Sequence, residues 1–289
     1  MKSFLFSFVI LHYNVQKETL ACIESIKNRV HDANYHIVVV DNASPNKSGV
    51  FLKDLFENDK LVTVLLNEKN LGFAKGNNVG IYYSRDVLKA DFLIVLNNDT
   101  FLVQDNFVQV IESEWERSGF AVLGPHVDTY VGVNQNPVPY SITKKSEIWL
   151  STYYCYAGLV RSFLGIDRIW GDFKKKVKLL VRRNEPLVLP DVRREMVKLH
   201  GCCWVFSPAF FEIFKGLDDR TFMYLEEDIL WNHILQSKLL SVYNPELKIF
   251  HAEDAATNSE KKTWRKKQIF FHKEHLKSIK VLKLVLQGQ

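Results

Sequence analysis

The sequence is poor in cysteine, and its few cysteines argue against two kinds of stabilisation. Four occur in 289 residues, two of them adjacent and none in a Cys-x-x-Cys pair. This pattern fits neither a structural zinc site nor a disulfide framework, so we expect buried, reduced thiols. Long apolar runs are missing too: no stretch has the roughly 18 uncharged residues of a spanning helix, and the N-terminal run lacks a signal-peptide cleavage site.

An excess of one charge is also missing. The chain has 38 basic and 33 acidic residues, and its formal net charge of +5 does not indicate nucleic acid as a partner. Neither GxGxxG nor GxxxxGK(S/T) occurs, which argues against a sugar-nucleotide dehydrogenase and against a P-loop enzyme. With 47% hydrophobic and 25% charged residues, the composition is that of an ordinary folded protein.

The first hundred residues alternate between strand and helix patterns. Apolar runs typical of buried strands cover residues 4–11, 36–40, 61–66 and 92–96. Helical spacing occupies residues 18–29, 50–56 and 73–84. The alternation predicts an α/β fold, with a Rossmann-like mixed, mostly parallel sheet flanked by helices.

The rest of the chain is less regular. Residues 130–196 are interpreted as an irregular or helical insertion, and an apolar run at 199–206 predicts a buried strand. The remaining expected elements are a short helix at 210–214, a helix after Glu226-Glu227-Asp228, a last strand at 247–250 and a basic helical tail at 261–286.

Polar residues follow the predicted strands of the first half. They are Tyr13-Asn14, Asp41-Asn42, Asn67 to Gly72 and Asn97-Asn98-Asp99. Because ligands bind α/β sheets beyond the carboxyl ends of the strands, we expect these clusters to form one site.

Two of these strand ends carry a carboxylate. Asp99 with its flanking amides suits a hard divalent cation whose other ligands are diphosphate oxygens, or it forms an Asx turn that ends the strand. Asp41 can accept hydrogen bonds from a ribose or a nucleobase, or it closes a turn. By itself, each motif leaves both interpretations open.

Three further motifs carry candidate chemistry. Glycines at 72, 76 and 80 permit a close backbone approach, and the helix that begins there favours an anion at its N-terminus. The three acids of Glu226-Glu227-Asp228 are either dipole partners on a solvated helix start or include a general base. His251 ends the last strand as a metal or phosphate ligand, or as a structural histidine.

Together, the order and spacing of these motifs resemble the inverting glycosyltransferases of family 2, which share the GT-A fold. The resemblance spans nearly the whole chain, is weakest over 130–196, and is greatest to the rhamnosyltransferase-like bacterial branch that builds surface polysaccharides. The matching segments are Val9 to Asn14, Val40 to Ser44, Asn70 to Gly80, Leu96 to Thr100, Gly201 to Phe206, Gly216 to Asp219, Phe222 to Leu230 and His251 to Thr257.

The resemblance implies a nucleotide-diphosphate sugar donor, linked to dTDP or UDP, and a divalent metal, Mg²⁺ or Mn²⁺. By position, Asp41 would contact the base, Asp99 would bind the metal, and His251 would lie near the metal and phosphates. Asn97 stands where the family usually has the first Asp of a DXD motif, so one carboxylate fewer is available to the metal. The expected donor-binding residues are Tyr13, Asn14, Asp41, Asn70, Gly72, Asn77, Asn97 and Asn98.

The acid pair that the family places near the acceptor maps to Glu226-Glu227. We predict Glu227 as the base, with Asp228 as the rival because the acidic run leaves the register open by one. The base would deprotonate an acceptor hydroxyl in a single displacement that inverts the sugar and needs no enzyme nucleophile. This requires Asp99 and the acids to face each other across a sugar-sized gap.

The reaction implied is the transfer of rhamnose or another hexose to a hydroxyl of a cell-surface polysaccharide or a lipid-linked saccharide. A non-catalytic relative that binds a nucleotide sugar or a polysaccharide is the alternative. Asn97 supports that alternative, and the intact acidic run argues against it.

We expect four parts in the chain. Residues 1–129 would form the nucleotide-sugar-binding half, 130–196 an insertion with acceptor or membrane contacts, 197–258 the acceptor and catalytic half, and 259–289 a basic helical tail. The expected location is the cytoplasm, including the inner face of a bacterial plasma membrane. The oligomeric state is not indicated.

The membrane expectation comes from basic residues interleaved with apolar ones between Arg161 and Arg194 and after Lys261. Helices with one apolar and one basic face lie on anionic lipid, although a solvated surface is the plainer interpretation. The apolar members are Trp170, Phe173, Val177, Leu179, Leu180 and Val181 in the first region and Trp264, Phe270, Phe271, Leu276, Ile279 and Leu282 in the tail.

Overall fold

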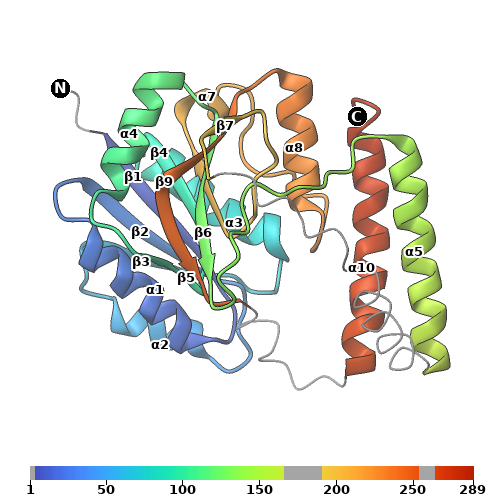
Figure 1. Ribbon diagram of the computed structural model, residues 1–289. Coiled ribbons are helices and arrows are strands. Elements are labelled where there is room, and N and C mark those ends of the chain that lie inside the picture. Colours follow the sequence, from blue (N-terminus) through green and yellow to red (C-terminus); the bar gives the residue numbers. More distant parts are fainter. Residues whose placement is uncertain (1–3, 166–190, 254–263) are drawn as a thin grey trace.

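The computed structural model describes residues 4–165, 191–253 and 264–289, and Figure 1 shows a mixed α/β fold. Within these ranges the strands form one sheet of nine, in the order β3-β2-β1-β4-β8-β6-β9-β5, with β7 paired to β9. The predicted fold class is therefore confirmed. Trp170, Phe173, Val177, Leu179, Leu180 and Val181, on which part of the membrane expectation depends, lie outside the described residues.

The first half contains every predicted element. Its strands are β1 (Leu5–His12), β2 (Asn34–Asp41), β3 (Val62–Leu66) and β4 (Phe92–Asn97). Its helices are α1 (Gln16–Arg29), α2 (Ser48–Leu55) and α3 (Phe73–Tyr82), which continues into the π-helical turn η1 (Tyr83–Val87). The pairs β1–β2, β2–β3 and β1–β4 are all parallel, so their carboxyl ends meet at one edge of the sheet.

Beyond β4 the structure holds four elements that were not predicted: β5 (Thr100–Leu102), α4 (Phe107–Ser118), β6 (Val122–Thr129) and the short strand β7 (Arg194–Glu195). The others are α5 (Lys145–Leu164), β8 (Cys203–Phe206), α7 (Pro208–Phe211), α8 (Glu226–Ser237), β9 (Ser241–His251) and α10 (Trp264–Val285). The strand expected at 199–206 begins only at Cys203. The last strand is longer than expected because it pairs with β6 from Ser241 onward.

Strand direction changes at β8. This strand runs antiparallel to both β4 and β6, whereas β6 and β9 are parallel. The start of β8 therefore lies beside the end of β4, where Leu96 pairs with Cys203. The residues at the start of β8, although far along the chain, therefore lie at the sheet edge where the parallel strands end.

The core has two layers because successive side chains of β1 point to opposite faces of the sheet. Phe6 and Phe8 pack with α1 and α4 on one face, and Val9 packs with α3, α7 and α8 on the other. All four cysteines are buried and unpaired, as expected.

Helices α5 and α10 lie side by side at one end of the molecule, with α10 nearer the sheet (Figure 1). Ile148 and Cys155 of α5 share a small core with Ile279 and Leu282 of α10. The prediction that the apolar residues of the tail face lipid is therefore wrong for Ile279 and Leu282, which are packed against protein. None of the described helices combines the length and the apolarity that crossing a bilayer requires.

Candidate active site

A cavity of about 690 Å³ opens at the edge where β1 and β4 end and where β8 and α8 begin. Asp99 and the acidic run from Glu226 to Asp228 all line it. The required meeting of these acids across one gap is therefore observed. The predicted residues on its wall are Tyr13, Asn70, Gly72, Asn97, Asn98, Asp99, Glu226, Glu227, Asp228 and His251.

Two strand pairings bring Asp99 to His251. The end of β4 is held by the Asn97 N–H, which donates to the Cys202 carbonyl at 2.9 Å. The next strand, β5, pairs Thr100 with His251, and the Ala252 N–H donates to the Asp99 carbonyl at 2.9 Å. His251 Nε2 consequently lies 3.3 Å from Asp99 Oδ1, and both side chains are buried.

The neighbour of His251 fixes which ring nitrogen carries the proton. Its Nδ1 lies 2.8 Å from Gln135 Oε1, while the amide nitrogen of Gln135 donates to Glu253. Nδ1 is therefore a donor, and Nε2 is the ring nitrogen that faces the carboxylate of Asp99. A nitrogen and a carboxylate oxygen 3.3 Å apart are close enough to share one cation. The carboxylate suits Mn²⁺ or Mg²⁺ that takes its other ligands from a diphosphate, and the imidazole would add one nitrogen ligand.

A second cluster, His200 with Cys202 and His251, has ligand atoms within 4.8 Å of one another. It fits such a cation less well. Burial raises the pKa of the Cys202 thiol well above its usual value. The Cys202 N–H donates to His200 Nδ1 at 3.2 Å, which uses that lone pair and leaves Nε2 as an N–H donor.

This nitrogen of His200 lies near Glu227. His200 Nε2 lies 3.8 Å from Glu227 Oε1, and the Gly201 N–H donates to the same oxygen at 2.6 Å. Burial lowers the pKa of His200 to about 4, so its ring is neutral at pH 7. Burial also raises the pKa of Glu227, which is the direction that makes a carboxylate a better base.

The three acids of the run have different surroundings. The carboxylate of Asp228 accepts from Lys198 Nζ at 3.0 Å and from the Ile142 N–H at 2.8 Å. Glu226 accepts from the Thr221 hydroxyl at 3.3 Å, and burial raises its pKa to about 7. Both contacts of Glu227 described above fall on Oε1, and Glu227 lines the cavity.

The opposite wall is a loop tied together by Asn42. Its side-chain nitrogen donates to Asn70 Oδ1 and to the Gly72 carbonyl, both at 3.0 Å. Gly72 has φ +83°, and a Cβ there would lie 2.1 Å from the Phe222 carbonyl oxygen. Only glycine fits this close contact between the two halves of the site.

The structure does not bring three of the expected donor-binding residues to the cavity wall. Asp41 is turned toward Ser44, whose hydroxyl and N–H donate to its carboxylate. Asn14 adopts φ 64° in the turn after β1. The amide nitrogen of Asn77 donates to the Phe73 carbonyl at 3.0 Å within its own helix. A nucleobase contact of Asp41 stays a prediction.

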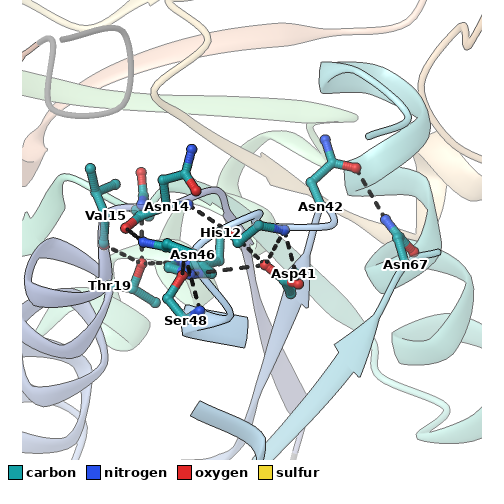
Figure 2. Close-up of polar contacts among 11 residues, drawn as sticks. His12, Asn14, Val15, Thr19, Asp41, Asn42, Asn46, Ser48 and Asn67 are labelled. Atoms are coloured by element: carbon teal, nitrogen blue, oxygen red, sulfur yellow. Dashed lines mark hydrogen bonds and ion pairs between the residues drawn. The ribbon is translucent and has the colours of Figure 1, made fainter. Parts of the chain in front are cut away.

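His12, at the end of β1, lies between α1 and α2. It was not predicted as a site residue from the sequence. Figure 2 shows it between Thr19 and Ser48, each 2.7 Å from a ring nitrogen, with Asp41 at 3.9 Å. Burial lowers its pKa to about 4. The ring joins β1 to α1 and α2, and this polar network sets the shape of the strand ends beneath the cavity.

Sequence reasoning also missed much of the cavity wall. The unexpected residues include His200, Gly201 and Trp204 from the start of β8, and the aromatic pair Phe222 and Tyr224 before α8. The helix α10 contributes Lys267, Phe270, Phe271 and His275. Aromatic density was the available signal for 222–224 and 270–271, but local sequence does not tell which helix reaches the site.

The architecture is that of the GT-A fold. More specifically, the chain belongs to glycosyl transferase family 2, whose family model matches residues 7–174. The family resemblance read from the sequence is thereby confirmed. The rhamnosyltransferase-like branch within the family stays a prediction.

Two curated relatives illustrate the breadth of the match. Glycosyltransferase GlyG of Streptococcus pneumoniae is 28% identical over 121 residues, which are 42% of this chain and 38% of GlyG. The low-salt glycan biosynthesis hexosyltransferase Agl10 of Haloferax volcanii is 23% identical over 223 residues, which are 76% of this chain and 58% of Agl10. The chain thus spans between roughly two-fifths and three-fifths of these relatives.

Two solved structures share the fold. Residues 1–349 of S. aureus TarS give a TM-score of 0.52 at 12% identity, with 86% of this chain and 60% of TarS covered. GalNAc-T7 with UDP, GalNAc and Mn²⁺ gives 0.56 at 13% identity, with 87% of this chain and 44% of GalNAc-T7 covered. At these identities the likeness concerns the architecture alone.

Proposed function

We propose that the chain is an inverting, metal-dependent glycosyltransferase that takes a sugar from a nucleotide diphosphate and transfers it to a saccharide hydroxyl. The observation that carries the proposal is the single cavity that holds both the Asp99–His251 pair and Glu227. Membership of family 2 supports the reaction class. The divalent metal, Mn²⁺ or Mg²⁺, would be held by Asp99 and His251.

The donor would lie along the wall made by the strand ends. When bound, the metal neutralises charge on the departing diphosphate. Asn97 and Asn98 flank the donor phosphates, and the loop held by Asn42 and Asn70 faces the nucleoside. A UDP- or dTDP-linked hexose, rhamnose included, is the donor class that we propose. UDP is the nucleotide bound by the architectural neighbour GalNAc-T7.

Glu227 would act as the base. Its Oε1 is held by the Gly201 N–H at 2.6 Å, which leaves Oε2 to accept the proton of the acceptor hydroxyl. As the acceptor oxygen bonds to the anomeric carbon, the bond from that carbon to the diphosphate oxygen breaks. The nucleotide diphosphate leaves with the electron pair, and the sugar configuration inverts because only one displacement occurs.

The acceptor would enter on the aromatic side of the cavity. Tyr224, Phe270 and Phe271 line that side, next to the acidic run. Aromatic rings pack against the apolar faces of sugars, so a saccharide acceptor suits this wall better than a small charged molecule. A growing surface polysaccharide or a lipid-linked saccharide has the required hydroxyl.

A thermal-shift screen of UDP-, dTDP- and GDP-sugars with Mn²⁺ or Mg²⁺ tests the donor. A true donor at about 100 times its dissociation constant adds about 2.7 kcal/mol of stability. Nucleotide release in the presence of a saccharide panel then tests transfer. Metal-dependent donor binding with no turnover on any acceptor would favour the non-catalytic binding protein, and no binding of any nucleotide sugar would contradict the proposal.

A further inference from the structure

The outer side of α5 is apolar along almost its whole length. The side chains on it are between 57% and 70% exposed. They are Trp149, Leu150, Tyr153, Tyr156, Val160, Phe163 and Leu164. From Trp149 to the end of the helix, the only charged residue is Arg161. Among the described residues, no other helix exposes so many large apolar side chains.

Helical geometry places these residues on one continuous face. The steps from Trp149 to Tyr153, Tyr156, Val160 and Phe163 alternate between four and three residues, which keeps them on one side of a helix. The opposite side packs on the protein, where Cys155, Gly158 and Ser162 are buried. The α5 face, defined as the seven exposed residues above, is thus directed away from α10 and the sheet.

The breadth and composition of the α5 face argue for lipid rather than for a second helix. Leu150 and Leu164 widen the stripe beyond the narrow seam of a coiled coil, and the flanking positions lack the charges that usually select a partner helix. Trp and Tyr, which make up three of the seven residues, are the residue types enriched where protein meets the membrane–water boundary.

The neighbouring helix supplies the complementary charge. Five lysines of α10 are exposed, and its one acidic residue, Glu274, is buried beside Lys277. The exposed lysines are Lys266, Lys273, Lys277, Lys280 and Lys283. A helix that carries an apolar face and lysines binds anionic bilayers peripherally, and here these two features are divided between two helices that pack together.

We propose that the α5 face is a membrane-docking surface that inserts into the headgroup region of an anionic bilayer. Docking does not depend on the reaction. The benefit of docking for catalysis does rest on the proposed function. Phe270 of α10 lines the cavity and α10 packs on α5, so the acceptor side of the cavity lies one helix away from the lipid. An acceptor saccharide carried on a lipid anchor would meet the site there.

Vesicle flotation of the full chain tests this proposal. The vesicles are phosphatidylcholine with phosphatidylglycerol, or phosphatidylcholine alone. The test variant combines Trp149→Gln, Tyr153→Gln and Phe163→Gln. A matched control combines Val50→Gln, Phe51→Gln and Leu55→Gln, which are also exposed apolar residues but lie on α2. Because all six side chains are exposed, both variants are expected to fold, and their melting curves verify this.

The wild type and the α2 control should float with anionic vesicles, less so at high salt. The α5 variant should partition at least about tenfold more weakly, because it removes apolar area from the bilayer contact. Flotation of the α5 variant at the wild-type level would overturn the proposal. A wild type that never floats would also overturn the proposal. This holds if light scattering finds the wild type monomeric, and it holds if light scattering finds a dimer that the α5 substitutions dissociate. Donor binding in the thermal-shift screen is measured separately, so failure of docking and failure of the proposed function are distinguishable.

Discussion

Asp228 and Glu227 are adjacent acids at the start of α8, and replacing them one at a time distinguishes a structural carboxylate from the proposed base. Asp228 is paired with Lys198 at 3.0 Å, and the two side chains are 10% and 7% exposed. Removing one partner of such a pair leaves an uncompensated buried charge, which costs about 3–5 kcal/mol. For a chain of this size, Asp228→Ala should lower the melting temperature by roughly 10 °C.

Glu227→Gln should have the opposite profile. An amide oxygen can still accept from the Gly201 N–H, so the stability should change by less than about 1 kcal/mol. The amide cannot take a proton from the acceptor, and the loss of a general base should lower turnover by about 10²–10⁴-fold. Donor binding should persist because Asp99 and His251, the proposed metal ligands, are unchanged.

The two variants are compared by thermal denaturation and by nucleotide release with the donor found in the screen. A double variant, Asp228→Ala with Lys198→Met, should recover part of the lost stability because no buried ammonium remains. If Asp228→Ala melts like the wild type but is inactive, while Glu227→Gln turns over normally, the base is Asp228 and the reasoning from the ion pair fails.

Three further predictions concern the metal, the pH dependence and the packing of α10. Asp99→Ala and His251→Ala should each remove the Mn²⁺ dependence of UDP binding measured by calorimetry; equal wild-type affinities with and without Mn²⁺ would contradict the assigned ligands. Since burial raises the pKa of Glu226 from 4.5 to about 7, the folded protein keeps a proton that the unfolded chain releases. Its contribution to stability therefore falls as the pH rises from about 4.5 to about 7, and Glu226→Gln should be more stable than the wild type at pH 8 by roughly 1–3 kcal/mol, with the difference fading toward pH 4. An unchanged pH profile of urea denaturation would argue against a buried, protonated Glu226. Finally, a Cβ at Gly158 would lie 2.1 Å from His272 Nε2, so Gly158→Ala should cost about 1–3 kcal/mol in a melting experiment, whereas Ser146→Ala, on the exposed side of the same helix, should cost little.

The parallel half of the fold was predictable because its signals are local. Each strand there is one apolar run, and β1, β2 and β3 are each followed by a helix. The strand β6 was missed because Gly124, Pro125 and Asp128 interrupt its apolar pattern, and β5 has only three residues. Helix α4 was overlooked even though Phe107, Ile111 and Trp115 have clear helical spacing, so that signal was present.

The site was predictable where a motif ends a strand, as for Asp99 and His251. The direction of a side chain was not: Asp41 also ends a strand, but Ser44, three residues later, holds its carboxylate in the turn. The tail was interpreted incorrectly for a related reason. An apolar helix face looks the same in sequence whether it packs on lipid or on protein, and Ile279 packs on protein.

Helix α10 is the last of the described elements to be translated, and this has a consequence for biosynthesis. The strand ends with Asn97 and Asp99 are translated early, and every strand of the described sheet precedes α10. Since domains begin to fold from the N-terminus during synthesis, a nascent chain can assemble its donor wall while the side formed by Phe270 and Phe271 is still missing. Under the proposed function, a ribosome-bound intermediate would have a donor wall without an enclosed acceptor site, and transfer would begin only after α10 has emerged and packed.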